Sequence, residues 1–389
     1  GLVVAQTALA LVLLVGSGLL LRRWQELRSV DPGYDTEDLL TFQFAPGEAE
    51  GLVGPEVLAR FHLDFMERLR ALPGVETVGL VENVPLDESV GSVRLRRESD
   101  VGEDDEGPLV GRTWTAGDYF EAMGIELLRG RTFADSDHTT ELGNAIVSSS
   151  AAAQLWPGEE AIGQRFRWPG RDEWYTVVGV VEDVMQYSLR DRPQPLVYFS
   201  LVSPTPDFWQ FSSPGYVVRS ERASELVPEV RELIREVTPS APMYRVYTME
   251  ELVSGSMVTL SFTMTTLAVA ALLALLLGLV GLYGILSFAV AQRTREIGVR
   301  MALGARAAEV RRMVVGRGAR VVAGGVIVGS IVAAASTRAL SSLLFGVAAF
   351  DAATFAAVSA GMLAVGVLAS YLPARRASAV DPIESLRAG

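Results

Sequence analysis

The chain has 389 residues, a formal net charge of −12 and no cysteine, and all 34 of its basic residues are arginine. The absence of lysine excludes a P-loop and a Schiff-base lysine. The absence of cysteine excludes thiol nucleophiles, thiolate metal sites and disulfides. The two histidines, His62 and His138, are expected to be solvated rather than to bind a metal or to act in a triad. We therefore predict that the chain is not an enzyme and has no catalytic, metal or cofactor site of its own.

The first 21 residues form an uncharged apolar run that ends at Arg22 and Arg23. A helix that crosses a bilayer needs about 20 such residues, so residues 1–21 are predicted to form the first transmembrane helix. A signal peptide is the alternative, but it would carry a basic segment before a shorter apolar run. Because the chain starts with Gly1 inside the apolar run, we expect a fragment or the later half of a longer polypeptide.

Residues 22–258 carry 22 arginines against 41 acidic residues. They are predicted to form a mixed α/β domain, with two lobes because the segment exceeds the usual size of a single core. Strands are expected at 40–44, 75–81, 176–181, 196–199 and 216–218. Helices are expected at 55–72, 116–123, 149–156 and 223–237. The interval 81–108 has no clear pattern, and its acidic part is expected to be a solvated loop.

Three more apolar runs predict transmembrane helices at about 260–290, 321–345 and 352–372. The last two form an antiparallel hairpin because the connection between them is short. Arg338 interrupts the third run, and we expect its side chain to extend to the headgroups rather than to line a polar path. Small residues let such helices pack closely, and six glycines are candidates for these contacts: Gly278, Gly281, Gly284, Gly324, Gly325 and Gly329.

Between the second and third spans lies the segment Ala291–Arg320, which holds eight arginines and only two acidic residues. Short basic loops stay on the cytoplasmic side of a membrane, so residues 22–258 are expected on the outer side. Residues 259–389 carry 12 arginines against 5 acidic residues, which agrees with this orientation. Apolar residues recur in the segment at steps of three and four, which predicts basic amphipathic helices, the first ending near Gly304. Such a helix lies on lipid or docks into another protein.

Three strings together resemble the MacB/FtsX-type ABC transporter permeases: LVVAQTALALVLLVGSGLLLR at Leu2–Arg22, QRTREIGVRMALGA at Gln292–Ala305 and SYLPARRASAVDPIESLR at Ser370–Arg387. The segments Leu155–Trp168 and Val177–Val184 are similar to the periplasmic core domain of that family. The likeness covers nearly the whole chain and is most specific to the second half of the large duplicated permeases abundant in Acidobacteria. Those proteins carry two such halves, whereas one is visible here.

The resemblance implies four transmembrane helices plus a MacB-like periplasmic core domain at 22–258 and an FtsX-like permease domain at 259–389, in a bacterial inner membrane. It also implies a coupling helix at about 292–304 that meets a separate ATPase, which binds the ATP. The residues expected in this helix are Arg293, Arg295, Glu296, Ile297, Gly298, Arg300, Met301 and Gly304. The alternative is a solvated interfacial helix in which Glu296 and Arg300 form an i,i+4 pair.

The expected function is that of a permease subunit that couples ATP hydrolysis to movement of the outer domain, for export or extraction of peptides, lipoproteins or amphiphiles. The expected partners are the ATPase, a second permease half or a second copy of the chain, the bilayer and an extracytoplasmic adaptor, without nucleic acid. The alternative is a signalling or scaffold subunit that activates an outer partner such as a cell-wall hydrolase. A neighbouring gene for an efflux-type adaptor favours export, whereas one for a hydrolase favours switching.

Overall fold

The structure is a computed structural model that describes residues 1–28, 30–46, 51–87, 89–100, 107–138, 143–189, 191–200, 213–293, 296, 306–340 and 351–377. The chain divides into two compact units. The membrane unit consists of Gly1–Arg28 and Val258–Gly389, and the outer unit consists of Ser29–Met257.

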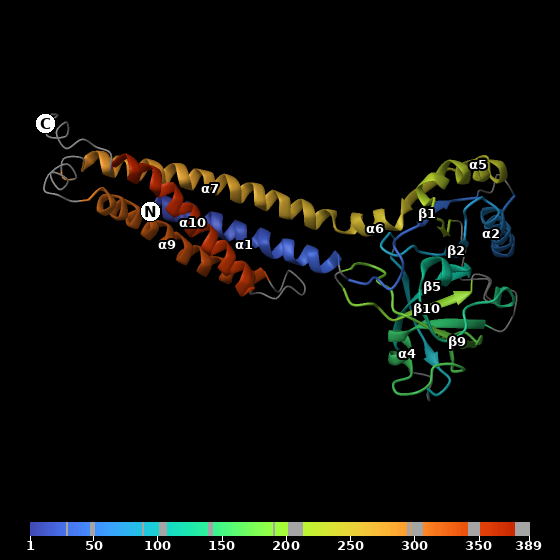
Figure 1. The fold of residues 1–389 in the computed structure, drawn as a ribbon. Helices are drawn as coiled ribbons and strands as arrows, with labels where there is room; N and C mark the ends of the chain where they lie inside the picture. The colour runs from blue at the N-terminus through green and yellow to red at the C-terminus, as the bar shows by residue number, and fades with distance from the viewer. Residues whose placement is uncertain are drawn as a thin grey trace. The chain divides into compact units, whose positions relative to one another are not determined.

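Within the described residues, the membrane unit has four helices that are long and apolar enough to cross a bilayer (Figure 1). They are α1 (Leu2–Arg28), α7 (Val258–Gln292), α9 (Ala307–Leu340) and α10 (Ala352–Ala377). The four predicted transmembrane helices are therefore confirmed. Helix α9 begins well before the apolar run at Val321, since alanine and arginine favour helix and no proline interrupts the segment. The second half of the arginine-rich segment thus belongs to a transmembrane helix rather than to a separate surface helix.

Helix α1 packs against the other three helices, and α9 also packs along α10. Two glycines of α9 lie where this helix meets α1. A Cβ atom at Gly329 would lie 2.9 Å from the Cα atom of Ala8, and one at Gly325 would lie 2.5 Å from the Cβ atom of Thr7. These distances are shorter than side chains tolerate, so the absence of a Cβ atom lets the two backbones approach.

The predicted role of glycines in helix packing is confirmed for this pair in α9. In α7, Gly281 also faces α1, where a Cβ atom would lie 3.2 Å from the side-chain oxygen of Gln6, and Gly278 is in looser contact with the same residue. The prediction is wrong for Gly284 and Gly324, because among the described residues no atom lies within 4 Å of a Cβ placed at either one.

At the end of the bundle opposite the arginine-rich segment, the side chain of Asp351 contacts both α10 and α1. Its carboxylate accepts a hydrogen bond from the backbone N–H of Thr354 at 2.9 Å and so caps the first turn of α10. It also accepts a hydrogen bond from the Thr354 hydroxyl and forms an ion pair with Arg22 of α1. Together these contacts lower the pKa of Asp351 to about 2, and the hydrogen bond from the Thr354 side chain is the largest cause.

The outer unit is built on one sheet, in which twelve strands are described. The strands are β1 (Leu39–Phe44), β2 (Thr77–Val81), β3 (Gly91–Arg94), β4 (Arg96–Arg97), β5 (Leu109–Gly117), β6 (Leu127–Gly130), β7 (Gly143–Ser148), β8 (Arg165–Arg167), β9 (Tyr175–Val181), β10 (Leu196–Ser200), β11 (Gly215–Arg219) and β12 (Met243–Thr248). Their order is β12-β1-β11-β2-β5-β10-β7-β9-β8-β4, with β3 paired to β5 and β6 paired to β9. The β5–β10 and β7–β9 pairs are parallel, and the other pairs are antiparallel.

Successive residues of the central strands contribute to two different hydrophobic clusters. In β10, Val197 and Phe199 belong to one cluster, whereas Leu196 and Tyr198 belong to the other. Because side chains alternate across a sheet, the two clusters lie on opposite faces. The helices of this unit are α2 (Pro55–Arg70), α3 (Tyr119–Met123), α4 (Ser149–Leu155), α5 (Val227–Val237) and α6 (Met249–Ser256). Helices α2, α4 and α5 contribute buried side chains to the first cluster, and α3 and α6 contribute to the second.

The five predicted strands coincide with β1, β2, β9, β10 and β11, and the helices predicted at 55–72 and 149–156 coincide with α2 and α4. The helix predicted at 116–123 is wrong at its start, because β5 continues to Gly117 and α3 begins only at Tyr119. Gly117 has a φ of +60° and ends the strand, a conformation that favours glycine. Among the described residues strand pairing continues through one sheet, and the division into two lobes stays a prediction.

Candidate functional site

The candidate site lies at the end of the membrane unit where the arginine-rich segment joins α7 to α9. Of the eight residues predicted for the coupling helix, the structure describes Arg293 and Glu296. The other six fall outside the described residues: Arg295, Ile297, Gly298, Arg300, Met301 and Gly304. Their role in binding an ATPase stays a prediction.

Three helices meet at this end. Val310 and Val314 of α9 and Ala374 of α10 are buried together, and Val290 of α7 packs against them. One turn further along α9, a Cβ atom at Gly318 would lie 2.8 Å from the Cβ atom of Ser370 in α10 and 3.1 Å from a methyl carbon of Leu286 in α7. The glycine therefore brings α7, α9 and α10 close together just inside the arginine-rich segment.

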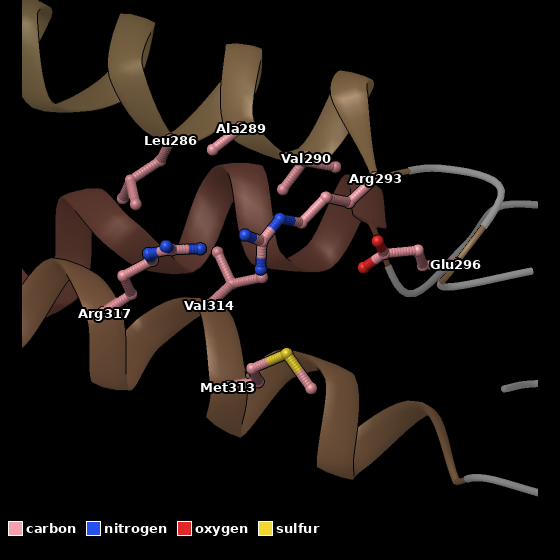
Figure 2. A pocket seen from close by; sticks show the side chains of 8 residues that line it. All are labelled: Leu286, Ala289, Val290, Arg293, Glu296, Met313, Val314 and Arg317. Carbon is pink, nitrogen blue, oxygen red and sulfur yellow. The ribbon is translucent and has the colours of Figure 1, made fainter.

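A cavity of about 140 Å³ opens between α7 and α9 at this end (Figure 2). Its lining residues are Leu286, Ala289, Val290, Arg293, Glu296, Met313, Val314 and Arg317. The side chains of Leu286 and Val314 are buried and form an apolar floor, whereas Arg293 and Arg317 are exposed. Figure 2 shows the two guanidinium groups directed into the same cavity from different helices.

Among the described lining residues of this cavity, the charged ones are two arginines and one glutamate. Among the described residues, no carboxylate lies within 4.0 Å of the guanidinium of Arg293 or Arg317. In Figure 2 the guanidinium of Arg293 lies between that of Arg317 and the carboxylate of Glu296. The described lining residues therefore sum to a net charge of +1 above an apolar floor. Such a site is suited to a singly charged anion attached to an apolar group.

Sequence reasoning missed Met313, Val314 and Arg317 as members of this site. The available signal was their spacing, since these residues and Val310 recur at three- and four-residue steps and so share one face of α9. The pattern indicated an amphipathic helix. It did not indicate that this face would lie against α7 beside Arg293.

The prediction that His62 is solvated is wrong. Its side chain is fully buried in the outer unit, and its Nδ1 atom lies 2.5 Å from the hydroxyl oxygen of Tyr216. Burial also raises the pKa of Tyr216 well above its ordinary value. The pair lies within the first hydrophobic cluster, where a polar group needs a partner, so its role is structural. Among the described residues, no group of three or more histidine, aspartate or glutamate side chains could hold a metal ion.

Comparison with known proteins accounts for nearly the whole chain. Residues 1–237 match the family model of the MacB-like periplasmic core domain, and residues 268–382 match that of the FtsX-like permease C-terminal domain. A curated relative is the uncharacterized ABC transporter permease YknZ of Bacillus subtilis, which is 24% identical over 188 residues. This match covers 48% of the chain and 47% of YknZ, so the chain spans about half the length of that relative.

The solved structures that the chain matches include the periplasmic region of MacB from Actinobacillus actinomycetemcomitans, at 12% identity and a TM-score of 0.40. That match covers 59% of this chain and 97% of the MacB region. The extracellular domain of YknZ from Gram-positive bacteria matches at 16% identity and a TM-score of 0.35, over 53% of this chain and all of that domain.

The two family models match consecutive parts of the chain in the order expected for one permease. The first covers α1 and the outer unit as far as residue 237, and the second covers most of the remaining membrane helices. The chain therefore belongs to the family of MacB/FtsX-type ABC transporter permeases and is a multi-pass membrane protein whose MacB-like domain lies outside the cytoplasm.

Proposed function

We propose that this chain is a permease subunit that transmits conformational work from a cytoplasmic ATPase to its outer unit, with α7 as the connecting element. The observation that carries the proposal is the position of α7 in the chain. One residue, Met257, separates α7 from α6, and the arginine-rich segment follows at the other end.

Helix α6 is well anchored in the outer unit. Its residues Met249 and Leu252 are buried in the second hydrophobic cluster. The side chains of Thr248 and Glu251 form a reciprocal capping box at its first turn. A displacement of α7 along its axis would therefore act on a fixed element of the outer unit rather than on a loose loop.

The length of α7 also favours transmission. Its 35 residues span about 52 Å, whereas the hydrocarbon core of a bilayer is about 30 Å thick. The helix is thus long enough to extend beyond the hydrocarbon, and it carries no charged residue from Val258 to Gln292. An element of this kind can tilt or shift without moving a charge into lipid.

The interior of the membrane unit does not favour a polar conduit within one chain. One cavity among its four helices has a volume of about 10 Å³, and its walls include Thr7, Leu275, Leu282, Val322 and Met362. A water molecule needs at least that volume and two or more polar partners. A larger hollow of about 340 Å³ between α1 and α7 is lined mainly by apolar residues. We therefore propose that the substrate, a peptide, lipoprotein or amphiphile, is handled on the outer side. A second permease half or a second copy of the chain would complete the transporter.

The test is retention of an ABC ATPase by tagged chain purified from native membranes, together with ATP turnover of the complex. The variant Ile297→Asp places an unpaired charge in the groove that the coupling helix would occupy, at a cost of about 3–5 kcal/mol. We expect it to reduce ATPase retention more than a hundredfold. Met301→Asp should have the same effect.

The control is Arg295→Ala, which removes a charge at the rim of the contact and should cost less than about 1 kcal/mol, mainly as altered salt dependence. All three variants should reach the membrane like the parent, because insertion depends on the apolar spans. Equal ATPase retention by the parent and by Ile297→Asp would refute the coupling assignment and leave a surface helix. An outer hydrolase retained in place of an adaptor would favour the signalling alternative.

A further inference from the structure

The cavity between α7 and α9 lies at the level where the hydrocarbon of the cytoplasmic leaflet gives way to headgroups. On α7, Phe288 is 65% exposed and is the last large apolar side chain on the outside of the helix, and Arg293 follows about 7.5 Å further along the axis. Headgroups occupy roughly 5–8 Å on each side of the hydrocarbon. The guanidinium of Arg293 is therefore at the depth of lipid phosphates.

The position of Arg317 is deeper. Its neighbour Gly318 packs against Leu286, which precedes Arg293 by about two turns of α7. Arg317 is thus level with side chains that face hydrocarbon, and among the described residues no carboxylate neutralises it. A cation at this depth is stabilised by a polar partner, either a backbone carbonyl, as for Arg320, or an anion that enters the membrane edge with it.

From these contacts we propose that the cavity binds one anionic phospholipid of the cytoplasmic leaflet, with its phosphate between Arg293 and Arg317. The net charge of +1 over the described lining residues matches the single negative charge of a phosphatidylglycerol headgroup, and two planar guanidinium groups suit the oxygens of a phosphodiester. Glu296 lies on the far side of Arg293 from Arg317 in Figure 2 and so leaves the space between the arginines to the anion.

The apolar lining distinguishes a phospholipid from a free phosphate. Leu286, Ala289, Val290, Met313 and Val314 supply most of the cavity wall. Met313 is 46% exposed, although it lies beside the buried Val314. A glycerol backbone and the first carbons of an acyl chain would cover this wall, whereas a soluble anion would leave it exposed to water.

The experiment measures lipid binding to the purified, delipidated full chain by native mass spectrometry. The probes are dioleoyl phosphatidylglycerol and dioleoyl phosphatidylcholine. We expect the parent to bind the first lipid more tightly. R317Q should weaken its binding about fivefold, and R293Q/R317Q should weaken it about thirtyfold, since each arginine near an anionic lipid contributes a factor of about five.

The matched control is R320Q, on the same helix and one turn away. The Arg320 side chain is exposed, and its Nε atom donates a hydrogen bond to the carbonyl oxygen of Gly316 at 3.2 Å, so it does not line the cavity. This variant should bind phosphatidylglycerol within about twofold of the parent. If circular dichroism shows that R317Q does not fold, R293Q is used in its place. Its binding of phosphatidylglycerol should weaken by the same factor of about five.

Four results would overturn the proposal. The first is equal binding of the two lipids by the parent. The second is a loss in R317Q no larger than that in R320Q. The third is displacement of the lipid by millimolar inorganic phosphate. The fourth is unchanged lipid binding in R293Q/R317Q together with loss of the ATPase, which would make the cavity a protein contact. Lipid binding is measured on the chain without an ATPase. Failure of the proposed ATPase coupling would therefore not contradict the proposed lipid site.

Discussion

The contact between α9 and α1 offers a sharp test of how the membrane unit is held together. At Gly329, a Cβ atom would lie 2.9 Å from both the Cα atom and the carbonyl oxygen of Ala8, and 3.1 Å from the Cβ atom of Leu11. Ordinary contacts are at 3.4 Å or more. Because the atoms of Ala8 belong to the backbone, no side-chain rotation relieves the overlap. Gly329→Ala must therefore push the two helices apart.

Overpacking of this kind costs about 1–3 kcal/mol, but replacing glycine by alanine inside a helix also gains about 1 kcal/mol. Gly324→Ala separates the two effects, because within the described residues a Cβ atom at Gly324 meets no atom within 4 Å. Both variants gain the same helix propensity, and only Gly329→Ala has the overlap. The difference between them should therefore be about 1–3 kcal/mol.

The chain has no cysteine, so one introduced thiol reports on this contact without background. Thr7→Cys removes one γ atom without enlarging the side chain and places the thiol in α1 against Gly325, at a position that is 7% exposed. Maleimide labelling in detergent then measures how often α1 and α9 separate. Gly329→Ala should raise the labelling rate about 5- to 150-fold over Gly324→Ala. Equal rates, with circular dichroism unchanged, would show that the close contact does not hold the helices together.

Three further predictions concern the outer unit and the topology. His62→Leu leaves the buried hydroxyl of Tyr216 without its partner and should lower the free energy of unfolding by about 1–3 kcal/mol, and adding Tyr216→Phe should recover part of it in urea titrations. Burial tends to raise the pKa of Asp137, but hydrogen bonds from its neighbours lower it to about 2, below the ordinary value of 3.8. Stability should therefore fall as the pH drops from about 4 to about 2, and Asp137→Asn should remove that part of the acid sensitivity. Fusions of an exported reporter enzyme should be active at Gly107 and inactive at Gly304; equal activity at both sites would contradict the topology.

The membrane helices could be predicted because their signal, an uncharged apolar run, lies in consecutive residues of the sequence. An uncharged run of about 20 residues has few alternatives in a folded protein. Strands such as β10, with five consecutive buried residues, were found for a similar reason, since both faces of the sheet are covered and its first four residues are apolar or aromatic.

Strands whose side chains are buried only because other strands pair beside them were not predicted. In β5, the buried residues include Thr113 and Thr115, and the strand also contains Gly111. Their polarity and small size are typical of a loop. They lie in a strand because β10 and β2 pair on either side. At the edge of the sheet, β12 has half-exposed residues and a positive φ at Arg245, so its alternation is weak.

The same limit applies to the candidate site. The arginine-rich segment and its cytoplasmic side follow from counting charges along the chain. The pairing of Arg293 with Arg317 does not, because it depends on Gly318 bringing α9 against Leu286 of α7. A glycine that permits a close contact looks the same in a sequence as Gly324, which meets no described atom.

Arg22, one of three arginines at the outer end of α1, shows what charge counting omits. Arg22 contradicts the positive-inside pattern if each arginine counts as an isolated cation. In the structure its partner is Asp351, which lies at the start of α10 and at the other end of the sequence. That carboxylate is fixed by Thr354 as the cap of α10, so it is in place whether or not Arg22 pairs with it. The pair has no net charge. The remaining basic residues of the membrane unit therefore decide its orientation, and they are concentrated at the cytoplasmic ends of α7, α9 and α10.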